Sequence, residues 1–176
     1  MPSRRLFLIW PRYVASFGKP ILDLSWITSN IAVSGSIPIG KHKKLQHEGI
    51  RAVVDLREEA MDNADSLATH GIEFHHIAVK NYHAPSPQEL DQESDWVISR
   101  LDETLTNSKV LIHCQEGVGR SITLTCCVLM KQGNTLQKSL AIVRNHRWGI
   151  ALRKVQMRAL IDFEEKLHGN DRIIGS

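Results

Sequence analysis

Short runs of hydrophobic residues alternate with longer amphipathic stretches along this chain, a pattern typical of alternating strands and helices. Strands are predicted at residues 21–27, 31–33, 51–56, 73–79 and 110–113. Helices are predicted at residues 41–47, 59–69, 88–105, 122–130, 135–145 and 153–167. This order indicates an α/β domain with a central, mostly parallel sheet of about four to five strands flanked by helices.

The first twenty residues differ from the rest of the chain. They contain three prolines, at positions 2, 11 and 20, which exclude a long helix, and their charged side chains are all basic. We expect residues 1–20 to form a basic arm, residues 21–168 a single domain and residues 169–176 a tail. The arm either lies over the domain through its apolar residues 6–10 or makes weak contact with an anionic membrane surface.

The composition changes this picture little. The chain has 176 residues, of which 42 % are hydrophobic and 23 % charged, as in ordinary soluble domains. No apolar run approaches the roughly 20 residues that a membrane helix needs. The three cysteines are Cys114 and the adjacent pair Cys126 and Cys127, which form no disulfide framework. We therefore expect a cytoplasmic protein in which Cys126 and Cys127 belong to the core.

The net charge is small, but the charged residues are unevenly placed along the chain. The net charge is only +3, from 22 basic and 19 acidic residues, and no acidic residue lies between Glu116 and Asp162. That half of the chain should favour anions. Acidic stretches at residues 55–65 and 89–95 argue against a nucleic acid as the partner.

The segment with the clearest chemistry runs from His113 to Ser121, between an apolar strand and an apolar helix. Two glycines in it let successive backbone N–H groups turn inward, and the start of the following helix adds its positive end, so a phosphate fits there. The residues predicted to surround this phosphate are Gln115, Glu116, Gly117, Val118, Gly119 and Arg120.

Four side chains of this segment have expected roles. The N–H groups and Arg120 should lower the pKa of Cys114 and hold it as a nucleophilic thiolate. Arg120 can donate two hydrogen bonds to phosphoryl oxygens and stabilise them in the transition state. Ser121 can hydrogen-bond the sulfur and ease its departure, and His113 can brace the loop through backbone carbonyls.

This segment resembles the Cys-x5-Arg signature of the cysteine-dependent protein tyrosine phosphatase superfamily. With His113 before the cysteine and Ser121 after the arginine, it is similar to the dual-specificity branch. Residues 26–35, 49–57 and 75–86, together with Gln156, also resemble segments of that family. The resemblance implies a phosphoryl transfer to Cys114 followed by hydrolysis, without a metal or other cofactor. It implies phosphorylated proteins or small phosphomonoesters as substrates.

One position departs from the family pattern. An aspartic acid in the loop before Ala84-Pro85 protonates the leaving group in these phosphatases, and the matching residue here is Asn81. Because an amide has no acidic proton, four alternatives remain open: His83 or Asp62 supplies the proton, the enzyme is slow, the protein binds without turnover, or the substitution is engineered. General-acid help is worth about 10²- to 10⁴-fold, most of all for alkyl esters.

We expect a protein tyrosine or dual-specificity phosphatase, and two alternatives remain. The first is a phosphate-binding pseudophosphatase, which Asn81 favours. The second is a phosphoinositide phosphatase, which ranks lower because Glu116 would repel additional phosphates. The histidines at positions 75, 76, 83 and 113 match no common zinc spacing, so no metal site is expected.

Overall fold

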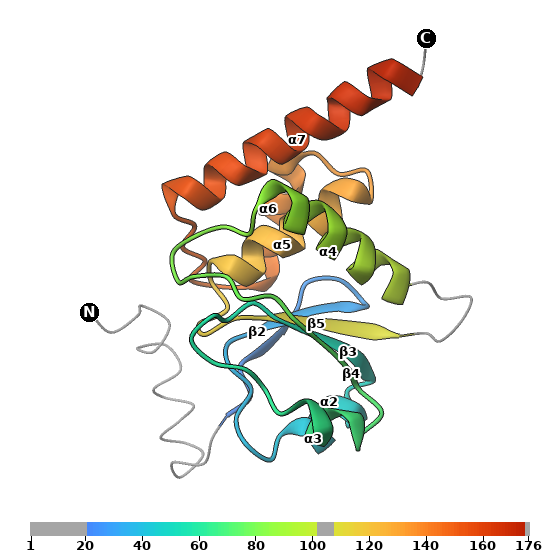
Figure 1. Cartoon of the computed structure of the whole chain (residues 1–176), viewed down its shortest axis with the longest axis vertical. Helices are drawn as coiled ribbons and strands as arrows, with labels where there is room; N and C mark the ends of the chain where they lie inside the picture. The colour runs from blue at the N-terminus through green and yellow to red at the C-terminus, as the bar shows by residue number, and fades with distance from the viewer. Residues whose placement is uncertain (1–20, 102–107, 175–176) are drawn as a thin grey trace.

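The computed structural model describes residues 21–101 and 108–174 (Figure 1). Its strands are β1 (Leu24–Trp26), β2 (Ile31–Ser34), β3 (Ile50–Asp55), β4 (Glu73–His76) and β5 (Lys109–His113). Its helices are α2 (His42–His47), α3 (Ala64–Ala68), α4 (Pro87–Arg100), α5 (Arg120–Lys131), α6 (Leu136–His146) and α7 (Lys154–Ile174). The predicted arm at residues 1–20 and the predicted helical residues 102–105 lie outside the described residues.

The sheet has five strands in the order β1-β2-β5-β3-β4. β1 pairs antiparallel with β2, and the remaining pairs are parallel, which confirms the predicted mostly parallel sheet. The central strand is β5, whose residues Val110, Leu111 and Ile112 are fully buried. Because β2, β5 and β3 are parallel, the segments that follow them start at the same edge of the sheet.

Helices cover both faces of the sheet (Figure 1). The larger core lies on the side of α4, α5, α6 and α7, and α5 supplies many of its residues, among them Ile122 and Val128. The smaller core lies under α2 and α3 and includes Leu45 from α2 and Leu67 from α3. Cys126 and Cys127 are fully buried in the larger core, as predicted.

Residues 57–63 form a loop, so the helix predicted to begin at residue 59 is shorter than expected. The helix α3 begins only at Ala64, with the Asn63 side chain accepting a hydrogen bond from the Ser66 N–H group. The Asp55 carboxylate fixes both ends of the loop before α3, because it accepts hydrogen bonds from the backbone N–H groups of Arg57 (3.0 Å) and Asp62 (3.2 Å). This local side-chain bonding competes with helix formation.

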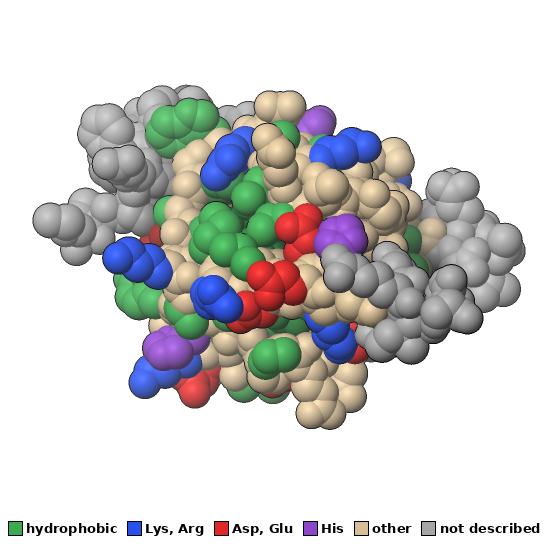
Figure 2. All heavy atoms as spheres, turned by 90° about the horizontal axis from the view of Figure 1, so that it is seen from above, with side chains coloured by type: hydrophobic (Ala, Val, Ile, Leu, Met, Phe, Trp, Pro, Cys, Tyr) green, Lys and Arg blue, Asp and Glu red, His purple; other side chains and the backbone are tan. Residues whose placement is uncertain are grey.

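The basic residues that follow one another in the sequence do not form a uniform basic surface. Lys131 pairs with Asp91 and Asp95 of α4. Within α7, Arg158 pairs with Asp162. Figure 2 accordingly shows charges of both signs around hydrophobic side chains on the α7 side of the molecule. None of the described helices is long and apolar enough to cross a membrane.

Candidate active site

The loop between β5 and α5 is shaped by donors that hold its carbonyl groups. The groups concerned are the backbone carbonyls of Gln115, Glu116, Gly117 and Val118. The Gln115 carbonyl accepts a hydrogen bond from the Ser36 N–H group (3.0 Å), and the Val118 carbonyl accepts one from the Ala151 N–H group (2.9 Å). The Glu116 and Gly117 carbonyls accept hydrogen bonds from the Arg147 guanidinium. Since a peptide's N–H group points away from its carbonyl, the N–H groups of the loop converge on the other side. The Gly117 N–H group does so, 3.3 Å from the Cys114 sulfur.

Arg147 is a functional residue that the sequence analysis missed. It directly follows α6 and is only 1 % exposed. Besides the two loop carbonyls, its guanidinium donates to the Val33 carbonyl (3.0 Å), the Ser25 hydroxyl (3.0 Å) and the Asp23 carboxylate (3.1 Å). It thereby fastens the loop to β1 and β2. In the sequence Arg147 is one of several arginines on amphipathic helices, so no local signal distinguishes it.

Cys114 lies at the base of this loop and is 3 % exposed. Burial alone would raise the pKa of its thiol. The hydrogen bond with the Ser121 hydroxyl (3.4 Å), the nearby N–H groups and the charge of Arg120 outweigh burial and lower that pKa below its usual value. The arrangement favours a thiolate, which is a better nucleophile than a thiol.

Arg120 is held by residues of the loops after β3 and β4. The Glu59 carboxylate accepts hydrogen bonds from both of its terminal nitrogens, at 2.8 and 2.6 Å. The carbonyls of Leu56 (3.2 Å) and Val79 (2.8 Å) accept from the same guanidinium. The hydrogen bond from Arg120 lowers the pKa of Glu59 and keeps it ionised. Four contacts therefore fix the orientation of this arginine beside the cysteine.

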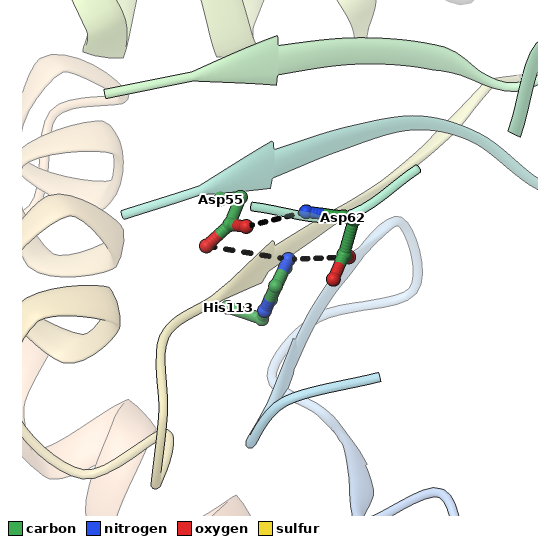
Figure 3. Close-up of side chains that lie close together, drawn as sticks. All are labelled: Asp55, Asp62 and His113. Atoms are coloured by element: carbon green, nitrogen blue, oxygen red, sulfur yellow. Dashed lines mark hydrogen bonds and ion pairs between the residues drawn. The ribbon is translucent and has the colours of Figure 1, made fainter. Parts of the chain in front are cut away.

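A buried polar cluster lies behind the active-site loop (Figure 3). His113 Nε2 lies 3.1 Å from Asp62 Oδ2 and 3.8 Å from Asp55 Oδ1. Arg57 donates to both carboxylates. The three ligand atoms are close enough together to suggest a metal site, yet a cation there would compete with the Arg57 guanidinium that already bridges the two acids. We therefore interpret the cluster as the anchor that joins the 57–62 loop to β5. The His113 Nε2 atom faces these carboxylates, and neither ring nitrogen makes a hydrogen bond to a backbone carbonyl, so the predicted bracing through backbone carbonyls was wrong.

A small cavity of about 70 Å³ opens above Cys114. Besides Cys114 and Arg120, its lining residues are Gln115, Glu116, Val118, Gly119, Asn81, Tyr82, Ala151, Arg153 and Gln156. The fold thus brings Asn81 and Gln156 to the predicted phosphate site, although both are distant from it in sequence. The Asn81 side chain turns back on its own loop, where its oxygen accepts the Tyr82 N–H group (3.0 Å).

The two alternative proton donors lie in different places. Asp62 does not line the cavity; burial would raise the pKa of its carboxyl, but the contacts with His113 and Arg57 lower it. An ionised, buried carboxylate is a poor proton donor, so its placement argues against this role. His83 does not line the cavity either, but it is on the loop that carries Asn81, with its Nδ1 atom 3.0 Å from the Asn81 carbonyl oxygen.

Comparisons with known proteins agree with this geometry. The family described as "Polymorphic toxin system, DSP-PTPase phosphatase" matches residues 34–134, more than half of the chain and all of the loop from Cys114 to Arg120. This protein belongs to that DSP-PTPase phosphatase family. The resemblance to dual-specificity phosphatases predicted from the signature is therefore confirmed.

Individual relatives are similar to a larger part of this chain than the DSP-PTPase family model matches. The dual specificity protein phosphatase PHS1 of Arabidopsis thaliana is 29 % identical over 154 residues, which are 82 % of this chain and 16 % of that protein. The chain thus spans about one sixth of the length of this relative. The crystal structure of Tk-PTP in the active form is 30 % identical, covers 81 % of this chain and 97 % of its own, and superposes with a TM-score of 0.74.

A third likeness concerns the fold alone. The structure of PTPMT1 in complex with PI(5)P covers 82 % of this chain and 96 % of its own, with a TM-score of 0.75 and 17 % identity. The DSP-PTPase sheet and its flanking helices are thus shared at low sequence identity.

Proposed function

We propose that this protein is a cysteine-dependent phosphomonoester hydrolase of the protein tyrosine or dual-specificity type. The observation that carries the proposal is the position of Cys114, at the base of a loop with outward-facing carbonyls and with a lowered thiol pKa. Phosphorylated proteins or small phosphomonoesters would be its substrates. Cys114, Cys126 and Cys127 are all free thiols, as is usual in a reducing compartment, which supports a cytoplasmic location.

The residues act in two steps. First, the Cys114 sulfur attacks phosphorus, an S–P bond forms, and the P–O bond to the leaving group breaks. The loop N–H groups and Arg120 stabilise the oxygens of the transferring group. Second, a water oxygen attacks phosphorus, the S–P bond breaks, and the Ser121 hydroxyl donates a hydrogen bond to the departing thiolate. The water's proton passes to solvent, and inorganic phosphate leaves.

The leaving group receives no proton from Asn81, since an amide does not act as an acid at neutral pH. A good leaving group, such as an aryl oxide, departs as an anion and needs little help. An alkoxide needs a proton, from His83 or from water. We therefore propose faster hydrolysis of aryl than of alkyl phosphates, by a larger margin than in a relative with an aspartic acid at this position.

The test is hydrolysis of a small aryl phosphate and a small alkyl phosphate across pH. Cys114→Ser should abolish phosphate release. Asn81→Asp should raise the rate for an alkyl phosphate by about 10²-fold or more and add a descending alkaline limb to the pH profile. His83→Gln in the unaltered Asn81 background should lower alkyl phosphate hydrolysis if His83 is the donor.

The second candidate function is a phosphate-binding module that releases its partner intact. The observation that favours it is the hydrogen bond from the Tyr82 N–H group to Asn81, which gives the amide a structural role. No phosphate release from the unaltered chain, together with release after Asn81→Asp, would support the module and contradict the hydrolase. Phosphoinositides rank second as substrates, because the exposed Glu116 lines the cavity and repels additional phosphates.

A further inference from the structure

We propose that Asn81 is a site of covalent modification, at which the side-chain amide deamidates to a carboxyl group in the cavity above Cys114. The attacking group is the backbone nitrogen of Tyr82, and water is the co-reactant. The modification supplies a proton donor at a position where the amide has none. Its effect on catalysis rests on the proposed function, whereas the modification itself does not.

Asn81 lies in a turn of residues 80–83, outside the helices and strands. A hydrogen bond from the His83 N–H group to the Lys80 carbonyl (3.1 Å) closes the turn, and Tyr82 within it has a positive φ of 66°. The Asn81 side chain is exposed. Water therefore reaches the amide, and neither a helix nor a sheet ladder restrains the backbone around it.

The side chain of Asn81 is folded back onto the peptide nitrogen that follows it. Its Oδ1 atom accepts the Tyr82 N–H group at 3.0 Å. Because Cγ is bonded to Oδ1 at about 1.23 Å, it lies no more than roughly 4.2 Å from that nitrogen. Groups react faster when the fold holds them close to the distance of attack. The contact thus brings the electrophilic carbon and the nucleophilic nitrogen together before the reaction begins.

The other asparagines that the structure describes lack this contact. The oxygen of Asn30 accepts a hydroxyl group, that of Asn63 accepts the N–H group three residues later, and the amide of Asn134 donates to a carbonyl. Asn145 is also exposed, but it lies in α6, where N–H groups donate to carbonyls four residues earlier. Exposure alone therefore does not distinguish Asn81, whereas the contact with the next nitrogen does.

The reaction has two steps and no change of oxidation state. The Tyr82 nitrogen loses its proton to hydroxide, its electron pair forms a bond to Asn81 Cγ, and the Cγ–Nδ2 bond breaks. The departing nitrogen takes a proton from water and leaves as ammonia, so that a cyclic imide remains. Water then adds to one of the two imide carbonyls. Opening at Cγ gives an aspartate with the ordinary backbone, and opening at the other carbonyl gives an isoaspartate. Asparagine is accordingly among the thermolabile residues of proteins.

An aspartate at this position would lie where the phosphoryl group is transferred. Asn81 and Cys114 line the same cavity, whose volume is only about 70 Å³. A carboxyl group there can give a proton to a departing alkoxide, which an amide cannot. The aspartate form should therefore hydrolyse alkyl phosphates about 10²-fold faster or more than the amide form. The isoaspartate lengthens the backbone of the loop and should gain less.

The modification is measured in the Cys114→Ser protein, so that turnover plays no part. The folded protein and a synthetic peptide of residues 77–87 are kept in mildly alkaline buffer. Peptide mapping by mass spectrometry follows each asparagine and separates aspartate from isoaspartate. Asn81 should convert about tenfold faster than Asn145, and about tenfold faster in the protein than in the peptide, because only the fold holds the contact. Equal rates would overturn the modification site. Asn81→Gln is the matched control and should stay unmodified, because its longer side chain would have to close a six-membered ring.

The effect on catalysis is measured with Cys114 in place. Hydrolysis of a small alkyl phosphate should rise in proportion to the aspartate fraction, and the pH profile should gain the descending alkaline limb expected of Asn81→Asp. Asn81→Gln, kept under the same conditions, should show no rise. A rise of equal size in Asn81→Gln, or aspartate formation without a rise in an active enzyme, would overturn the gain of a proton donor.

The outcomes separate this proposal from the hydrolase. Conversion of Asn81 at the expected rate, with no phosphate release from any protein that has Cys114, would contradict the hydrolase and leave the modification site standing. Phosphate release with equal conversion of Asn81 and Asn145 would do the reverse. Conversion to isoaspartate alone would overturn the effect on the leaving group and leave both other conclusions standing.

Discussion

The Arg147 Nε–H group donates a hydrogen bond to the carbonyl oxygen of Gly117, thirty residues earlier in the chain. The same guanidinium reaches Glu116, Val33 and Asp23. A buried side chain that does not face the cavity thus sets the direction of two peptide groups in the phosphate loop.

Replacing Arg147 should therefore affect both stability and activity. Arg147→Met leaves the Asp23 carboxylate and several carbonyls without their donor, and we expect a loss of about 3–5 kcal/mol in the free energy of unfolding in urea. Arg147→Lys should recover part of the stability but little of the activity, because an ammonium group lacks the fixed, planar set of N–H donors of a guanidinium. Arg144→Gln, at an exposed position of α6, is the control and should change neither.

Gly117 is predicted to tolerate no side chain. Its φ is 65°, and an added Cβ would collide with the Ser34 carbonyl and the Arg147 guanidinium. Gly117→Ala should lower kcat by about 10²- to 10³-fold, as does the loss of a transition-state donor in other enzymes. Gly133→Ala has a similarly positive φ but open space around it. It should reduce stability and leave kcat unchanged; equal kcat losses in the two variants would contradict the prediction.

The pairing of Glu59 with Arg120 predicts a smaller effect. Glu59→Gln should lower kcat/KM about three- to tenfold, since it removes a charge-assisted contact that orients the arginine. The exposed neighbour Glu58 serves as the control, and Glu58→Gln should have no effect.

The same pair predicts a dependence of stability on pH. The pKa of Glu59 is lowered in the folded protein, so the stability from its ionised form is present above the ordinary value of about 4.3 and is lost as the pH falls through the lowered pKa. Urea unfolding at several pH values should show the difference between the unaltered chain and Glu59→Gln shrinking below about pH 4. A difference that grows on acidification would contradict this assignment.

The low thiol pKa of Cys114 is testable by alkylation with iodoacetate, whose carboxylate suits the anion site. Native protein should be modified at Cys114, with a rate that reaches its plateau below the free-thiol value of about 8.5. Ser121→Ala should move the midpoint of the rate's rise with pH to higher pH. Burial raises the pKa of Cys126 to about 12 and raises that of Cys127 well above its usual value, so mass spectrometry should find both unmodified.

The order of elements could be predicted from the sequence because hydrophobic periodicity is a local property. The apolar run at residues 110–113 predicted a strand, and the glycines after it predicted a loop suited to an anion. The helix predicted over residues 59–63 was wrong, because the Asp55 carboxylate binds backbone N–H groups there and a helical pattern does not reveal such contacts.

The sequence by itself determined the nucleophile loop, because Cys114, Arg120 and Ser121 lie within one short segment between a strand and a helix. Only the tertiary structure decided what surrounds this loop. Arg147 and Glu59 come from two different segments, and each is an ordinary polar residue in its own stretch of sequence. Their roles arise from distances between segments, which depend on how the helices pack against the sheet and not on local patterns.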